Sequence, residues 1–228
     1  MTISEAHLEF KLRLDKIDSL NYPNFLPEEI DLLLNQAQDK YVKQRYGLTN
    51  VKRQSFEETQ KRTEDLKNLV LTANLTLQPF SSNNIDSNAR FIILPTDHWF
   101  ILQERVTIQY NDCHNQVLTT SAEVRPIQHV EFDKVINDAF KKPDTSKVLR
   151  LMDNTQVEII FAQGITITNY KLRYLKRPVR VNIVTGVTFE LSDHTHSEII
   201  DLAVLITLEE IEGKRNQTFM PLIDNQKE

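Results

Sequence analysis

Hydrophobic residues in the first third of the chain recur at the spacing of amphipathic helices. We predict helices over residues 2–20 and 27–46. The second prediction is the clearer one, because Pro27 suits the first turn of a helix and apolar residues keep helical spacing as far as Tyr41. Gly47 is expected to end this helix in the left-handed conformation.

Two further helices are predicted, one at each side of a long central segment. The third helix is expected to begin at Ser55. The last spans 192–212, where Thr195 and Glu198 have the spacing of a capping box and a broad apolar face follows them. Because such a face needs a partner surface, we expect this helix to pack on the helices of residues 1–72.

The central segment changes to a period of two, with β-branched and aromatic residues alternating with polar ones. The predicted strands are 91–94, 99–110, 116–124, 156–162, 165–175 and 179–184. This pattern predicts a mostly antiparallel β domain over 73–191, interrupted by a short helix near 130–136. The fold class is therefore α+β, with a β domain inserted between helices and a tail, residues 213–228, after them.

Composition excludes several function classes. The 228 residues include four glycines, Gly47, Gly164, Gly186 and Gly213, which are too scattered to form a phosphate-cradling loop. We therefore expect no nucleotide cofactor and no hydrolase elbow. The single cysteine, Cys113, excludes a disulfide framework within the chain. No apolar stretch has the length of a membrane span or the form of a signal peptide, so we expect a soluble protein without a membrane partner.

Two motifs contain residues that could carry chemistry. His194 and His196, next to Asp193, are the type of side chain that holds zinc or iron, which makes a metal-dependent hydrolase one alternative. We favour capping and surface roles for them, because no second ligand cluster is visible, and we predict neither a metal site nor catalytic residues. Cys113 and His114 are adjacent in a segment that reads as a hairpin turn, not as a nucleophile and base from distant segments.

Charge is distributed unevenly along a chain whose net charge is −5. A run without acidic residues contains five cations, which are Lys171, Arg173, Lys176, Arg177 and Arg180. Because such a run could contact phosphates, a nucleic-acid-binding or DNA-gating protein is an alternative function. Residues 190–212 are acidic and contain no Lys or Arg, so unlike surfaces of two copies could also pair head to tail and close into a ring. We favour subunit pairing.

Seven short strings carry a resemblance that covers roughly residues 4–212. They are FLPEEID (25–31), NQAQ (35–38), KQRY (43–46), FEETQKR (56–62), LPTDHW (94–99), YLKRP (174–178) and HSEIIDLA (196–203). In this order they resemble a family of virion structural proteins from crAss-like and related tailed bacteriophages. None of the strings is a catalytic signature, so the resemblance implies a role and not a reaction.

The resemblance implies a ring or adaptor protein of the portal vertex that is not an enzyme. Its expected partners are further copies of itself, in a ring that is dodecameric in the family, the portal protein, and neighbouring ring or tail proteins. Transient, non-specific contact with DNA in the channel is expected as well. The implied location is the head–tail junction of the virion, after assembly in the host cytoplasm.

The tail contains an apolar cluster without helical spacing, formed by Phe219, Met220, Leu222 and Ile223. We predict that this segment is an arm that orders against the portal or a neighbouring ring. The alternative is that the tail folds back on its own helices.

Overall fold

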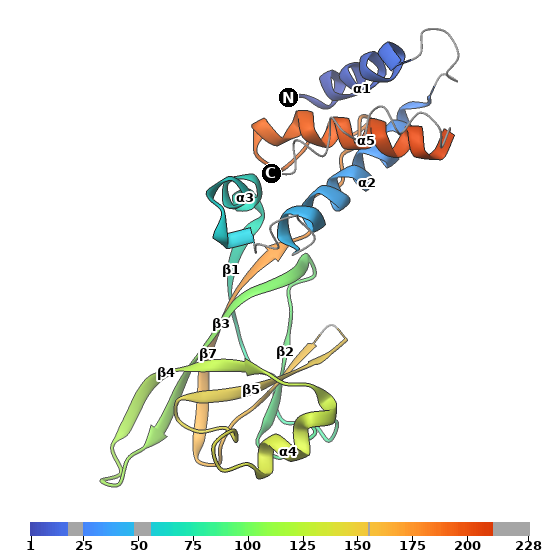
Figure 1. Cartoon of the computed structure of the whole chain (residues 1–228). Coiled ribbons are helices and arrows are strands. Elements are labelled where there is room, and N and C mark those ends of the chain that lie inside the picture. The colour runs from blue at the N-terminus through green and yellow to red at the C-terminus, as the bar shows by residue number, and fades with distance from the viewer. Residues whose placement is uncertain (18–24, 48–55, 155, 212–228) are drawn as a thin grey trace. The chain divides into compact units, whose positions relative to one another are not determined.

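The computed structural model describes residues 1–17, 25–47, 56–154 and 156–211 (Figure 1). The chain divides into two units, a helical unit formed by Met1–Leu69 with Pro178–Glu228, and a β unit formed by Val70–Arg177. The predicted α+β class is confirmed, because helices from both ends of the chain pack together and the segment between them forms a mostly antiparallel sheet.

The helical unit contains α1 (Ile3–Ile17), α2 (Pro27–Tyr46), α3 (Gln60–Leu66) and α5 (His196–Ile211). Short 3₁₀ helices cover Phe56–Glu58, Lys67–Leu69 and Asp193–Thr195. Helix α5 contacts both α1 and α2 (Figure 1), and its apolar face is buried, as expected from its width. Phe10, Leu34 and Ile199 are completely buried in this unit, one from each of these three helices.

Helix ends differ from the predictions at two positions. Gly47 does end α2, but its φ of −77° and ψ of 164° are extended, so the predicted left-handed cap is wrong. The predicted capping box of the last helix is also wrong, because Glu198 is drawn to Arg45 and Tyr41 of α2. Thr195 is instead buried, and its hydroxyl donates to the Ser192 carbonyl at 2.8 Å. Ser55, the expected start of the third helix, lies outside the described residues.

The β unit is one seven-stranded sheet. Its strands are β1 (Val70–Leu75), β2 (Ala89–Ile93), β3 (His98–Asn111), β4 (Val117–Pro126), β5 (Lys147–Asp153), β6 (Gln156–Ile160) and β7 (Ile165–Lys176). Their order across the sheet is β1-β7-β3-β4-β5-β6-β2, and the β4–β5 pair alone is parallel within this sheet. Strands β1 and β5 are absent from the predicted set.

Residues 179–184 were predicted as a strand, and that prediction is wrong. The Val181 N–H donates to the side-chain oxygen of Asn35 on α2 at 2.9 Å, and the Asn35 side-chain nitrogen donates to the Val181 carbonyl at 3.0 Å. The Ile183 N–H donates to Asp31 of the same helix at 3.0 Å. Side chains of α2 thus satisfy these backbone groups, and residues 183–186 form a turn that is closed by an isolated antiparallel bridge between Asn182 and Val187.

The sheet curls around one apolar core, and its outer side is covered unevenly. Inward residues of six strands form the core, with Tyr170 and Leu172 of β7 among its fully buried members. The short helix α4 (Phe132–Asn137) covers the outer side near β5 and β6, where Val135 packs with Leu149 and Leu151. The outward residues Gln103 and Arg105 of β3 and Lys171 and Arg173 of β7 are exposed, so that part of the sheet offers a free surface.

Candidate functional site

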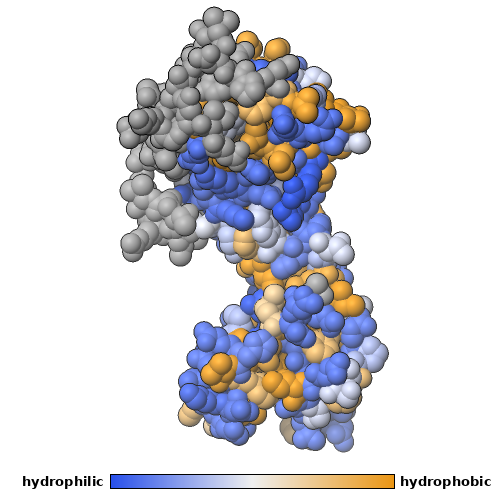
Figure 2. Space-filling model, turned by 90° about the vertical axis from the view of Figure 1, so that its right-hand side faces the viewer, coloured by the Kyte–Doolittle hydropathy of each residue, from blue (hydrophilic) through white to orange (hydrophobic). Residues whose placement is uncertain are grey.

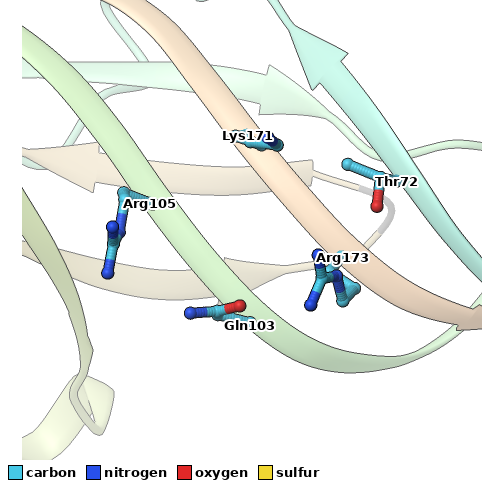
Figure 3. Close-up of a pocket in the computed structure, with 5 residues that line it drawn as sticks. All are labelled: Thr72, Gln103, Arg105, Lys171 and Arg173. Atoms are coloured by element: carbon cyan, nitrogen blue, oxygen red, sulfur yellow. The ribbon is translucent and has the colours of Figure 1, made fainter. Parts of the chain in front are cut away.

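Antiparallel register assembles a basic patch on the outer side of β1, β7 and β3. Arg105 of β3 is the register partner of Lys171 on β7, and Arg173 lies between Gln103 of β3 and Thr72 of β1. These five residues line an open pocket of about 200 Å³ (Figure 3). All five are exposed, and none of the three cations forms an ion pair with any other described residue. We call this set of five residues the basic pocket.

The other three cations of the predicted run lie elsewhere. Lys176 is half-buried at the end of β7. The guanidinium of Arg177 lies 5.8 Å from the centre of the Trp99 ring, and its backbone N–H donates to the Asp97 carbonyl at 2.7 Å. Arg180 is exposed and belongs to the helical unit. The run is thus divided, and the pocket gains Arg105, which no pattern in the sequence connects with Lys171.

A second polar group lies inside the curled sheet. Arg150 of β5 places Nη1 3.0 Å from a carboxylate oxygen of Glu104 on β3, and the Tyr170 hydroxyl donates to the same carboxylate. Burial raises the pKa of Glu104 and that of Tyr170. Strand β3 pairs with β4 only from Arg105 onward. Before Arg105, the contact between Glu104 and Arg150 therefore connects β3 with β5 directly, without backbone pairing through β4. We call these three residues the interior triad.

The helical unit uses several predicted surface charges internally. Asp65 of α3 is completely buried, with one oxygen 3.0 Å from Arg45 Nε and the other 2.8 Å from His194 Nε2. Arg45 also pairs with Glu198 of α5, which accepts a hydrogen bond from Tyr41 at 3.0 Å. Glu198 belongs to the segment 190–212 that was expected to form an acidic outer surface; it instead meets Arg45 inside one unit, where Arg45 joins α2, α3 and α5.

The two histidines of the H-x-H motif have separate partners. His194 pairs with Asp65, whereas His196 is buried, lies within 3.0 Å of the Leu191 carbonyl oxygen and has its pKa lowered by burial. Within the described ranges no group of three or more His, Cys, Asp or Glu side chains could hold a metal ion.

The segment around Cys113 forms the hairpin turn predicted from the sequence. The Asp112 carboxylate accepts hydrogen bonds from the N–H groups of His114 and Gln116 at 2.7 and 2.9 Å, and Asn115 has a φ of 58°. Cys113 is exposed in this turn between β3 and β4. These local hydrogen bonds therefore explain the polar residues of this segment as residues that form the turn.

Two further predictions concern the C-terminal tail and membranes. Phe219, Met220, Leu222 and Ile223 lie outside the described residues. For membranes, no helix in the described part of the chain is long and apolar enough to form a span.

Comparison with known proteins identifies the family. The model of the family described as phage tail ring protein 3/4 matches residues 1–212. Ring protein 4/5 of Bacteroides phage crAss001 is 25% identical over 226 residues, which cover 90% of this chain and 91% of that protein. Ring protein 3 of the same phage is 23% identical over 203 residues, covering 82% and 86% of the two chains. The predicted resemblance to virion ring proteins of crAss-like phages is confirmed, and the chain belongs to the phage tail ring protein 3/4 family.

Proposed function

We propose that this protein is a non-enzymatic ring subunit that joins the portal to the tail around the DNA channel of a phage virion. The observation that carries the proposal is the family match over residues 1–212, together with two relatives that are themselves named ring proteins. The subunit would form a dodecamer during assembly in the host cytoplasm and would remain at the head–tail junction. Its function would then lie in its outer faces.

Helix α1 has a second apolar face that a neighbouring subunit would cover. Ala6 and Phe10 are completely buried, whereas Leu8 and Leu12 are 60% and 51% exposed and lie one helical turn apart. Figure 2 shows hydrophobic residues at the surface of the helical unit among hydrophilic ones. Exposed apolar residues that recur on one helix face favour a protein contact.

The two units also differ in charge. The β unit contains 12 Lys and Arg against 11 Asp and Glu, whereas the helical unit contains 15 against 21. A heterologous ring contact joins unlike surfaces of successive copies, and opposite charge on those surfaces favours the correct orientation. The charge difference therefore supports head-to-tail pairing.

Electron microscopy of the purified protein, alone and with the portal protein, tests this proposal. We expect dodecameric rings on the portal. The double substitution Leu8→Glu and Leu12→Glu should prevent ring formation, because it places charge in the contact on α1. Lys11→Glu, which changes the charge of the same helix by the same amount, is the control and should still form rings. Wild-type monomers that ignore the portal would contradict the proposal.

The C-terminal tail is proposed as the docking arm. Deleting residues 214–228 should abolish assembly on the portal and leave the thermal unfolding of the subunit nearly unchanged, because an arm contributes contacts to a partner and not to its own core. The measurements are calorimetry and microscopy of the same preparation. Phe219→Ser with Leu222→Ser should have the same effect as the deletion. A large loss of subunit stability would show instead that the tail folds back on the helices.

A further inference from the structure

We propose that the basic pocket binds phosphate groups of the DNA backbone and is the part of the subunit that faces the DNA channel. This inference rests on the proposed ring function and assigns one surface to one ligand. The pocket is formed by Thr72, Gln103, Arg105, Lys171 and Arg173, which project from the outer side of three adjacent strands (Figure 3).

The spacing of the three cations follows from the sheet. Register partners on antiparallel strands lie about 5 Å apart, and residues two positions apart on a strand lie about 7 Å apart. Arg105 and Lys171 are register partners, and Lys171 and Arg173 are two positions apart on β7. Glu123 of β4 is the register partner of Arg105 on its other side, so an acidic residue borders the pocket without entering its lining.

Three neighbouring cations on one face of a sheet are unfavourable when no anion is bound to them. Like charges directly opposite each other on antiparallel strands destabilise the pair. Arg105 and Lys171 are such a pair, and Arg173 adds a third positive charge. Glu123, opposite Arg105 on β4, offsets only part of this repulsion, because it lies at one side of the three cations. A bound anion would remove this repulsion.

The chemistry of the lining favours nucleic acid over a protein partner. The other lining residues, Thr72 and Gln103, are polar, and the neighbouring outward residue Asn74 is polar and exposed as well. Arg, Lys, Thr and Gln are side chains that bind phosphate oxygens of a nucleic-acid backbone. The centre of a protein interface is enriched in Arg as well, but also in aromatic residues and Met, and the lining of this pocket contains neither. Because the pocket is open and reads no base edge, the contact would be independent of sequence.

The test measures binding of the full chain to a labelled DNA duplex by fluorescence anisotropy over a series of salt concentrations. The variant Arg105→Gln, Lys171→Gln, Arg173→Gln should lose on the order of several hundredfold in affinity at about 0.1 M salt, and the slope of log K against log salt should become shallower by about 2.7, at about 0.9 for each phosphate contact. Arg173→Gln alone should change the slope by about 0.9. Inorganic phosphate should compete only weakly, because it offers a single phosphate group.

The matched control neutralises three exposed lysines around α4, namely Lys134→Gln, Lys141→Gln and Lys142→Gln. Its net charge equals that of the pocket variant, and its DNA affinity should stay within about threefold of wild type. An equal loss in the control, or a wild-type chain that binds no DNA at low salt, would overturn the proposal. If the wild-type chain bound polyglutamate more tightly than DNA, and the pocket variant lost that binding, the partner would be an acidic protein and the DNA proposal would be overturned. The pocket variant should still form rings on the portal, so failure of the ring function is seen separately, in the wild-type protein by microscopy.

Discussion

Replacing Asp65 with alanine is expected to lower the free energy of unfolding of the helical unit by about 3 kcal/mol or more, because removing one partner of a buried ion pair leaves the other charge uncompensated. Asp65 is completely buried and contacts Arg45 of α2 and His194 before α5. The side chain of Arg45 is itself only 7% exposed, so water cannot readily replace the lost carboxylate. Urea unfolding followed by circular dichroism at the helical band measures the effect.

Glu64→Ala is the control for this substitution. Glu64 is the neighbouring residue, half exposed, and pairs with Lys67 at 2.6 Å on the surface. Exposed pairs of this kind contribute about 0.5 kcal/mol. If Asp65→Ala were as mild as Glu64→Ala, the network of Asp65, Arg45 and Glu198 would not hold the helical unit together.

Replacing Arg150 with alanine should destabilise the β unit by a similar amount, about 3 kcal/mol, because Glu104 and Tyr170 would keep a buried carboxylate without its cation. The single tryptophan, Trp99, lies in β3 and so reports on this unit by fluorescence. Urea unfolding followed at Trp99 therefore measures the loss without interference from the helices.

A double substitution separates burial of charge from loss of packing. Arg150→Met with Glu104→Leu replaces both charges by apolar side chains, and such replacements of buried pairs are often neutral or stabilising. We expect the double variant to recover most of the stability lost in Arg150→Ala. Arg125→Ala, an exposed arginine on β4, should have an effect below about 0.5 kcal/mol. A double variant less stable than Arg150→Ala would show that the interior triad stabilises the sheet through its charges.

One missed strand and one wrongly predicted strand show where local pattern and sheet pairing part. Strand β5 was missed because Val148 points into the main core while Leu149 and Leu151 pack under α4, so apolar residues do not alternate with polar ones. Residues 179–184 did alternate, but their hydrogen-bond partners are side chains of α2, which no local pattern encodes.

The candidate site could be predicted only in part for a related reason. Lys171 and Arg173 are two residues apart on one strand, so their common face follows from the period of two. Arg105 joins them through the register of β3 with β7, which depends on the bulges and pairing of the whole sheet. The same holds for Asp65 and Arg45, whose contact is set by the packing of α3 against α2. Residue identities were thus visible in the sequence, and their neighbours were not.

The register of the first and last strands of the β unit has an evolutionary consequence. Val70, where the chain enters the unit, is paired with Leu175, two residues before it leaves. Entry and exit therefore lie side by side on adjacent antiparallel strands, about 5 Å apart at the paired positions. An insertion with adjacent ends can be lengthened, replaced or recombined without rerouting the helices on either side of it. The β unit of this chain could thus be exchanged as a module while the helical unit keeps its chain path.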